Sequence, residues 1–379
     1  MASRSCRVST TIKALSDLGQ SIWCDNISRQ MLDSGELQRW IDLGVTGVTS
    51  NPTIFMKAVT GSRAYDARFN DLLAEGLDIM AIYEGLVLPD ITDAADILRP
   101  IYERTDGVDG YVSLEVNPRL AYDTDGTVAE ARRLFNEVDR PNVLIKVPAT
   151  DEGIPAIETL LAEGINVNVT LIFGLEVYDK VIRAYINGVT QHEAAGRDPA
   201  RIASVASFFI SRVDTLIDRL LAKKKTAGAK VDHLLGRAAI ANAKLAYARF
   251  AEMFRADGEM KPLFAKGARV QRPVWASTST KNPDYPETMY VDGLVGPDTV
   301  NTLPPQTIQA ALDYGRAASV LSRNLPEERR VLEELAGLGI EIKTVTDQLR
   351  IDGVAAFATS FDELLDNLVH KQSQLKVTG

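Results

Sequence analysis

Two charged residues stand inside segments that otherwise look like buried strands. Glu115 lies in YVSLEV (111–116) and Lys146 in VLIKVP (143–148). Burying a charge is costly unless the charge is paired or neutralised. One explanation is therefore a structural ion pair across neighbouring strands. The other is chemistry, because burial lowers the pKa of a lysine amine and makes it nucleophilic, while a nearby carboxylate moves protons. The two residues alone leave both explanations open.

Other polar residues come late in predicted strands or directly after them. They are Asp25, Asn51, Thr170, Ser207 and Ser277. In a barrel of parallel strands, the active site is assembled at the C-terminal ends of the strands. One functional group for each strand, all at that end, is the arrangement that such a site requires.

Each of these residues also has an ordinary structural explanation. Asp25 could cap a helix that enters at Ile27. Asn51 followed by Pro52 is a good helix N-cap with proline at the first helical position, so we expect a capping role even if Asn51 also binds substrate. The hydroxyls of Thr170 and Ser207 commonly bond to the backbone.

Alternation within the strands separates an apolar face from a polar one. In YVSLEV, Ser113 and Glu115 share a face opposite Val112, Leu114 and Val116. Leu144 and Lys146 likewise share a face in VLIKVP, and Asn166, Asn168 and Thr170 share one in NVNVT. We expect the apolar faces to pack on surrounding helices and the polar faces to line a barrel interior.

The positions of the strands are set by short apolar runs that alternate with longer amphipathic segments. This order favours a parallel α/β sheet. We predict a single closed (β/α)8 TIM barrel, with an open doubly wound sheet as the alternative. The expected strands are Ser21–Asp25, Thr46–Ser50, Tyr111–Val116, Val143–Val147, Asn166–Ile172, Ile202–Phe208, Val270–Ala276 and Met289–Leu294.

Three long segments exceed the minimal barrel. Residues 62–107 should hold two or three helices between the second and third strands, and residues 223–268 should lengthen the sixth crossover. Residues 298–379 should form a helical C-terminal extension with a short strand at Ile340–Val345. No break in composition separates these segments, so we expect residues 1–379 to form one domain with its core at about 20–300.

Composition and charge exclude several classes of function. The chain has 379 residues, 45% of them hydrophobic and 25% charged, and its net charge is −9. This acidic balance argues against nucleic-acid binding, which needs clustered Lys and Arg. A few local cations can still bind an anionic small molecule. The Lys223–Lys225 run follows an amphipathic segment and is best explained as a solvated helix end.

Cysteine and histidine usage points to a cytoplasmic protein without a metal site. Only Cys6 and Cys24 are present, which is no disulfide framework, and the N-terminus lacks the apolar stretch of a secretory signal. No apolar run approaches the roughly 18–20 residues of a membrane span. The three histidines are scattered, with no HExxH and no CxxC.

Seven segments together resemble the transaldolase family, and they cover about 22–303 of the sequence. SNPT, EVxxRL and IKVPAT in this order and spacing form a specific signal, although any one of them alone is weak. The segments are WCDNISR (23–29), TSNPTIF (49–55), SLEVNPRLAYD (113–123), VLIKVPAT (143–150), NVTLIF (168–173), SFFISRVD (207–214) and WASTSTKNP (275–283).

The resemblance implies a (β/α)8 barrel and class I aldolase chemistry, which needs no metal and no other cofactor. Its substrates would be sugar phosphates of the pentose phosphate pathway. A dihydroxyacetone unit would pass from sedoheptulose 7-phosphate to glyceraldehyde 3-phosphate, giving erythrose 4-phosphate and fructose 6-phosphate. The resemblance does not fix the oligomeric state, and we expect a monomer or a homodimer.

The resemblance also assigns expected roles to residues at the centre of the site. Lys146 is similar to the lysine that forms the Schiff base, and Asp25 to the acid/base aspartate. Glu115, helped by Thr170, would hold the catalytic water. The residues expected to hydrogen-bond the bound three-carbon unit and the rest of the substrate are Asn51, Asn168 and Ser207.

For the phosphate, the resemblance points to Arg212, Ser277 and Lys281. Arg212 stands at the start of a predicted helix, where a guanidinium and free backbone N–H groups can converge on an anion. The segment STSTK (277–281) departs from the commoner family pattern, in which an arginine closely follows the serine. Ser277 and Ser279 are therefore both candidates, and Lys281 would act as a point charge.

Three alternatives remain at this stage. A fructose 6-phosphate aldolase would share the lysine but release free dihydroxyacetone, and the long insertions here favour the transferase. A non-catalytic sugar-phosphate-binding barrel would not need the lysine–carboxylate core that this chain retains. Residues 298–379 could also serve as an oligomerisation module, although their ordinary amphipathic pattern does not require it.

Overall fold

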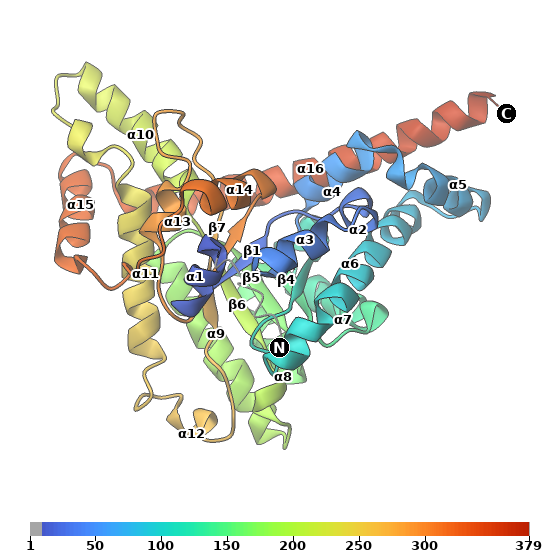
Figure 1. Cartoon of the computed structure of the whole chain (residues 1–379), viewed down its shortest axis with the longest axis horizontal. Coiled ribbons are helices and arrows are strands. Elements are labelled where there is room, and N and C mark those ends of the chain that lie inside the picture. The colour runs from blue at the N-terminus through green and yellow to red at the C-terminus, as the bar shows by residue number, and fades with distance from the viewer. Residues whose placement is uncertain (1–9, 379) are drawn as a thin grey trace, which may run out of the picture.

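The strands close into a single parallel barrel in the order β1 to β8 (Figure 1). This computed structural model describes residues 10–378, and their side chains as far as residue 373. Cys6 and the first residues of the N-terminus therefore lie outside the described part. The strands are β1 Gln20–Cys24, β2 Val45–Thr49, β3 Val112–Glu115, β4 Val143–Pro148, β5 Val167–Ile172, β6 Ser204–Phe209, β7 Arg272–Ala276 and β8 Thr299–Leu303.

Helices surround the barrel and extend the chain beyond it. Those before β6 are α1 Thr11–Asp17, α2 Arg29–Asp33, α3 Glu36–Leu43, α4 Pro52–Gly61, α5 Asp66–Ala74, α6 Ile79–Arg104, α7 Thr124–Val138, α8 Gly153–Glu163 and α9 Leu175–Ala194. Those after β6 are α10 Ser211–Thr226, α11 Ala238–Met253, α12 Lys261–Phe264, α13 Met289–Gly293, α14 Pro305–Tyr314, α15 Leu325–Gly337 and α16 Ile342–Thr378. Short 3-10 turns are η1 Arg63–Tyr65, η2 Pro118–Leu120, η3 Pro199–Arg201 and η4 Asp232–Leu234.

Local sequence signals set where the helices that precede the strands begin and end. The carboxylates of Asp78 and Asp123 cap α6 and α7 by accepting backbone N–H bonds. Helices α3 and α8 end at Gly44 and Gly164, whose φ values are 117° and 95°. A residue with a side chain rarely adopts this conformation, so glycine allows the chain to turn directly into β2 and β5.

The barrel and its first seven strands are confirmed, with each strand end within two residues of the prediction, but the predicted eighth strand is wrong. Met289–Gly293 forms α13, and the strand that closes the barrel is Thr299–Leu303. A five-residue apolar run does not distinguish a buried helical turn from a strand. The run TVNTL has the β-branched residues of a strand and is followed by two prolines.

The two internal insertions are confirmed. Residues 62–107 contain η1, α5 and α6, and residues 223–268 contain the end of α10 with η4, α11 and α12. The C-terminal extension is helical but begins after Leu303, because β8 occupies 299–303. The predicted short strand at Ile340–Val345 is wrong, since these residues form the turn into α16 and its first residues.

Helix α16 does not remain beside the barrel but crosses the region above the strand ends. It contacts α4, α6, α10, η2 and β5, which are far from it in sequence. In Figure 1 it runs as a long red helix from the barrel past α4 to the C-terminus. The tertiary structure therefore brings the C-terminal extension to the end of the barrel where a site is expected.

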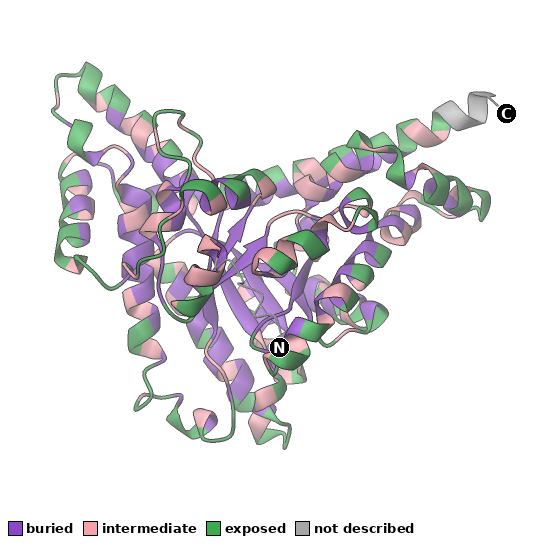
Figure 2. Ribbon diagram, in the orientation of Figure 1, coloured by how far each residue is buried: buried purple, intermediate pink, exposed green. Residues whose placement is uncertain are grey.

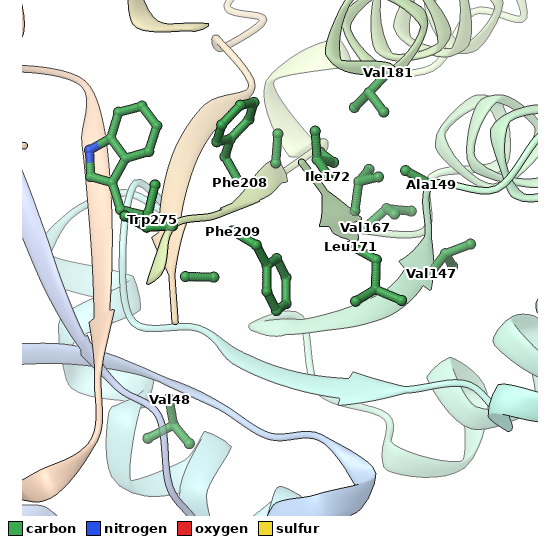
Figure 3. Close-up of a cluster of buried hydrophobic side chains, with 14 of the residues drawn as sticks. Val48, Val147, Ala149, Val167, Leu171, Ile172, Val181, Phe208, Phe209 and Trp275 are labelled. Carbon is green, nitrogen blue, oxygen red and sulfur yellow. The ribbon is translucent and has the colours of Figure 1, made fainter. Parts of the chain in front are cut away.

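The apolar core has an outer and an inner part. The outer part lies between strands and helices and includes Ile172, Phe208 and Trp275, with Val181 of α9 pointing toward the strands (Figure 3). Strands are buried while the outer faces of the helices are exposed (Figure 2). The inner part fills the N-terminal end of the barrel and consists of Trp23, Tyr111, Leu144, Val205, Val274 and Val300.

This division refines the expected alternation. Leu144 shares the inward face of β4 with Lys146, so one strand contributes an apolar floor and a polar group above it. Asn166 is not part of the polar interior. It bonds the backbones of Pro141, Val143 and Ala203 at the N-terminal edge of the sheet.

Within the described part of the chain, no helix is both long and apolar enough to cross a membrane.

A buried carboxylate ties the floor of the barrel together, and we predict that removing it destabilises the fold. Asp109 accepts hydrogen bonds from Trp23 Nε1 at 2.6 Å and Thr46 Oγ1 at 2.9 Å, and also from Ser21. Asp109→Ala leaves these donors without a partner, so the free energy of unfolding should fall by about 3 kcal/mol. Denaturant unfolding measures this change. Asp257→Ala, at a side chain that is 82% exposed, should change it by less than about 0.5 kcal/mol.

Candidate functional site

A cavity of about 550 Å³ opens at the C-terminal ends of the strands. This volume is typical of small-molecule sites. Glu115, Asn168 and Thr170 are buried outside its wall. The predicted site residues in the wall are Asp25, Asn51, Lys146, Ser207, Arg212, Ser277 and Lys281.

Lys146 lines this cavity, and Glu115 faces this lysine from behind the wall. They are register partners on β4 and β3, and Lys146 Nζ lies 3.5 Å from Glu115 Oε2. Their side chains are only 5% and 6% exposed. Lys146 Nζ also donates a hydrogen bond to the backbone oxygen of Ser50 at 3.0 Å. The ion pair proposed as a structural alternative is therefore present, yet its lysine borders a ligand-sized cavity.

Burial dominates the electrostatics of Glu115. It raises the pKa of this carboxyl from its ordinary value near 4.5 to about 7, although the charge of Lys146 acts in the opposite direction. Glu115 Oε2 and Thr170 Oγ1 are both buried without a hydrogen-bond partner in the protein. Buried polar atoms normally have such a partner, so both are suited to bind water or a substrate-derived oxygen.

Asp25 lies in the cavity wall rather than at a helix cap. Helix α2 starts at Arg29, and Ser28 caps it. The Asp25 carboxylate accepts a hydrogen bond from Thr49 Oγ1 at 2.8 Å, and this hydroxyl lies 2.5 Å from Thr302 Oγ1 of β8. Burial raises the pKa of Asp25, while Lys146 opposes that rise. A carboxyl in this state is suited to giving and taking protons.

Asn168 is fully buried and its amide is shared between two serines. It donates from Nδ2 to Ser113 Oγ at 2.9 Å and accepts from Ser207 Oγ at 2.7 Å. Ser207 reaches the cavity wall, whereas Asn168 does not. The position of Ser207 therefore depends on Asn168, and a direct contact between Asn168 and a bound sugar stays a prediction.

Asn51 combines the two roles expected for it. Its side-chain oxygen accepts a hydrogen bond from the backbone N–H of Ile54 at 3.0 Å, which makes it the N-cap of α4. The same residue forms part of the cavity wall. The capping bond fixes the side chain, so any group that Asn51 offers to a ligand is held in place by the helix.

Cations gather at the outer part of the cavity. Arg212 is the second residue of α10, and Lys281 lies in the loop after β7. Lys281 is exposed, but partial burial of its ammonium lowers its pKa, and the positive charges of Arg212 and Lys57 lower it further. These groups form a local positive end in a chain of net charge −9, which suits a phosphate.

Both candidate serines lie in the wall of the cavity, and they differ in their surroundings. Ser277 has φ 57°, and its Oγ lies 3.1 Å from Ser211 Oγ at the start of α10. Ser279 Oγ accepts a hydrogen bond from Lys281 Nζ at 2.6 Å. The sequence predicted free backbone N–H groups at the start of α10. The first of them, that of Ser211, instead donates to the carbonyl of Ser277 and is not available to an anion.

Several wall residues were not found from the sequence. Thr302 would have been identified by alternation if β8 had been placed correctly. Lys57 is an exposed residue in the middle of α4, where a lone lysine carries no signal. Phe357 comes from α16, more than 200 residues from Lys146 in sequence, and an apolar residue in a helix predicts only packing. Among the described residues, no group of three or more His, Cys, Asp or Glu side chains is arranged to hold a metal ion.

Comparison with known proteins gives one consistent answer. The family model described as Transaldolase/Fructose-6-phosphate aldolase matches residues 22–368. The chain belongs to this family. It is 46% identical over 367 residues to Transaldolase 2 of Nostoc sp. (strain PCC 7120 / SAG 25.82 / UTEX 2576), covering 94% of this chain and 96% of the relative. It is 49% identical over 362 residues to the Transaldolase of Thermobifida fusca (strain YX), covering 95% and 98%.

A further relative is the Transaldolase of Mycolicibacterium paratuberculosis (strain ATCC BAA-968 / K-10), 49% identical over 358 residues, or 94% of this chain and 95% of the relative. The family-model match spans the barrel and most of α16. Members of the transaldolase/fructose-6-phosphate aldolase family are enzymes that work through a lysine Schiff base. Membership agrees with the resemblance and with the closed barrel.

The raised pKa of Glu115 predicts a pH-dependent stability. The stability that this group confers is fully present below about pH 4.5 and is lost as the pH rises through about 7, because the buried carboxyl resists ionisation. The quantity to follow is the free energy of unfolding of the wild type minus that of Glu115→Gln. This difference should fall by up to about 3 kcal/mol between pH 5 and pH 8. Denaturant titrations across this range measure the difference.

Glu163 provides a control, because its pKa is shifted in the opposite direction from that of Glu115. Its hydrogen bond with Arg132 lowers its pKa, so the stability it confers is lost only when the pH falls into the acid range. The difference between the wild type and Glu163→Gln should stay flat from pH 5 to 8. If the difference between the wild type and Glu115→Gln were also flat from pH 5 to 8, Glu115 would ionise in the folded protein without a free-energy penalty, and the prediction would be wrong.

Proposed function

We propose that this chain is a transaldolase that carries a dihydroxyacetone unit on Lys146. The donor is sedoheptulose 7-phosphate and the acceptor is glyceraldehyde 3-phosphate, a reaction of the non-oxidative pentose phosphate pathway. The observation that carries this proposal is the placement of Lys146. Its amine borders the cavity, contacts Glu115 at 3.5 Å, and shares the cavity with Asp25 and the cations near Arg212.

The first step of the proposed mechanism joins the donor to the enzyme. The neutral amine of Lys146 attacks the C2 carbonyl carbon, and the carbonyl oxygen takes up a proton to give a carbinolamine. Loss of this oxygen as water leaves a protonated imine. Glu115, whose pKa of about 7 allows proton exchange near neutral pH, handles the proton and the water together with Thr170.

The second step breaks the bond between C3 and C4. Asp25 removes the proton from the C4 hydroxyl, the oxygen forms the carbonyl of the leaving aldehyde, and the electron pair of the broken bond moves into the imine to give an enamine. The raised pKa of Asp25 suits this transfer. The enamine then attacks the acceptor aldehyde, Asp25 returns the proton, and water releases the new ketose.

The remaining residues hold the substrate. We infer that Arg212, Ser277 and Lys281 bind the phosphate, with Ser277 favoured over Ser279 because Ser277 contacts the start of α10 beside Arg212. Asn51 and Ser207 lie in the wall where the hydroxyls of the three-carbon unit would bind, and Asn168 supports Ser207. The cytoplasmic location and the oligomeric state stay predictions.

Borohydride trapping tests the covalent step. With fructose 6-phosphate as donor, reduction should leave a three-carbon adduct on Lys146, identified by peptide mass mapping, and chelators should have no effect. Lys146→Arg keeps the positive charge without a usable nucleophile, so it should show no adduct and no transfer activity. An adduct on another lysine of the wild type, or activity that disappears with EDTA, would contradict the mechanism.

Product analysis separates the transferase from the aldolase. With fructose 6-phosphate alone, a transaldolase retains the enamine, so free dihydroxyacetone should form at most about once per active site. Addition of erythrose 4-phosphate should then give sedoheptulose 7-phosphate with continuous turnover. Multiple turnovers to dihydroxyacetone without any acceptor would instead favour the fructose 6-phosphate aldolase.

A further inference from the structure

Helix α16 is fastened over the mouth of the barrel by polar contacts at several points. Ser360 accepts a hydrogen bond from Thr53 of α4 at 2.8 Å, and Asp362 pairs with Arg119 of η2 at 2.5 Å. Both partners follow strands that contribute to the site, β2 and β3. The helix is therefore tied to α4 and η2, the segments that directly follow Asn51 and Glu115 in the chain.

One helical turn of α16 approaches the strand ends unusually closely. A Cβ on Gly353 would lie 2.9 Å from Leu171 Cδ2 and 3.7 Å from Arg212 Nη1. Glycine in a helix interior is unfavourable by about 1 kcal/mol relative to alanine. Close packing against β5 and Arg212 gives a physical reason for glycine at this position.

Phe357 follows Gly353 by one turn and reaches the cavity itself. Its side chain is 4% exposed and forms part of the wall that also contains Lys146 and Asp25. The centre of its ring lies 6.0 Å from Cζ of Arg212. Phe209, at the end of β6, lies 5.4 Å from the same guanidinium.

The rings of Phe209 and Phe357 both lie within cation–π distance of the Arg212 guanidinium. Within the described part of the chain, no carboxylate oxygen lies within 4.0 Å of it. Aromatic rings attract a guanidinium without supplying strong hydrogen-bond acceptors, so its N–H donors stay available for an anion. Holding the side chain before substrate arrives also reduces the entropy lost on binding.

We propose that Phe357 is a positioning residue that, with Phe209, holds Arg212 toward the phosphate and so makes α16 a determinant of phosphate selectivity. The inference rests on the proposed function only in assigning the substrate phosphate to Arg212. It gives the C-terminal helix a role in substrate discrimination that does not depend on oligomerisation.

The test compares two acceptors with sedoheptulose 7-phosphate as donor, because fructose 6-phosphate and glyceraldehyde 3-phosphate would only regenerate each other. Selectivity is the ratio of kcat/KM for D-glyceraldehyde 3-phosphate to that for D-glyceraldehyde. Phe357→Ala and Phe357→Leu should lower this ratio roughly tenfold, about the effect of one desolvated cation–π contact. The loss should come mainly from KM for the phosphorylated acceptor, and Phe357→Tyr, which keeps an aromatic face, should restore the ratio.

Phe361 is the matched control, one turn further along α16. It is 2% exposed, packs edge-on against Tyr83 at 5.3 Å, and does not border the cavity. Phe361→Ala should lower the Tm at least as much as Phe357→Ala while leaving the acceptor ratio unchanged. The leucine variant retains most of the packing volume, so it provides a folded protein if the alanine variant is too unstable.

The outcomes separate the two proposals. An unchanged ratio in Phe357→Leu, or an equal fall in Phe361→Ala, would overturn the role of Phe357. Borohydride trapping with dihydroxyacetone, run on the wild type and on Phe357→Leu, reports the Lys146 chemistry independently. A wild type that is trapped at Lys146 but shows no effect of Phe357 would overturn this inference alone, whereas a wild type that is not trapped would overturn the proposed function.

Discussion

A lysine and a glutamate are buried side by side on neighbouring strands, with Lys146 Nζ 3.5 Å from Glu115 Oε2. Neither charge would be tolerated there alone, because each would lose its hydration without compensation. The pair can exist only if β3 and β4 keep their register, in which Glu115 lies opposite Lys146. A shift of either strand by one residue would turn its charged side chain toward the helices and separate the pair. The chemistry of the site therefore depends directly on the register between β3 and β4.

The closed barrel meets this constraint by dividing its interior into two levels. An apolar floor around Trp23 and Leu144 fills the N-terminal end, while polar groups occupy the level above it. Because the strands run in parallel, side chains from distant parts of the sequence meet at one end. Asp25 of the first βα connection thus joins Lys146 of β4 and Arg212 of α10 around the same cavity.

Charge is arranged locally rather than over the whole molecule. The chain carries a net charge of −9, yet Lys57, Arg212 and Lys281 converge on the cavity. Arg212 is held beside two phenylalanine rings rather than by a carboxylate, which would compete with a phosphate for the guanidinium. This arrangement gives an acidic protein a local positive site that suits an anionic group.

The sequence by itself determined the barrel, seven of its strands, and the residues that gather around Lys146, because strand alternation and the ordered motifs are local properties. It misplaced the eighth strand, since the short run 289–294 is compatible with either a strand or a buried helix. Only the tertiary structure decided that Asn168 reaches the site through Ser207, and that α16 covers its mouth with Phe357. The contact between Asn168 and Ser207 joins residues 39 apart, and that between Arg212 and Phe357 joins residues about 145 apart. Such contacts leave no periodic signal in the sequence, so they follow only from how the closed barrel and its C-terminal helix pack.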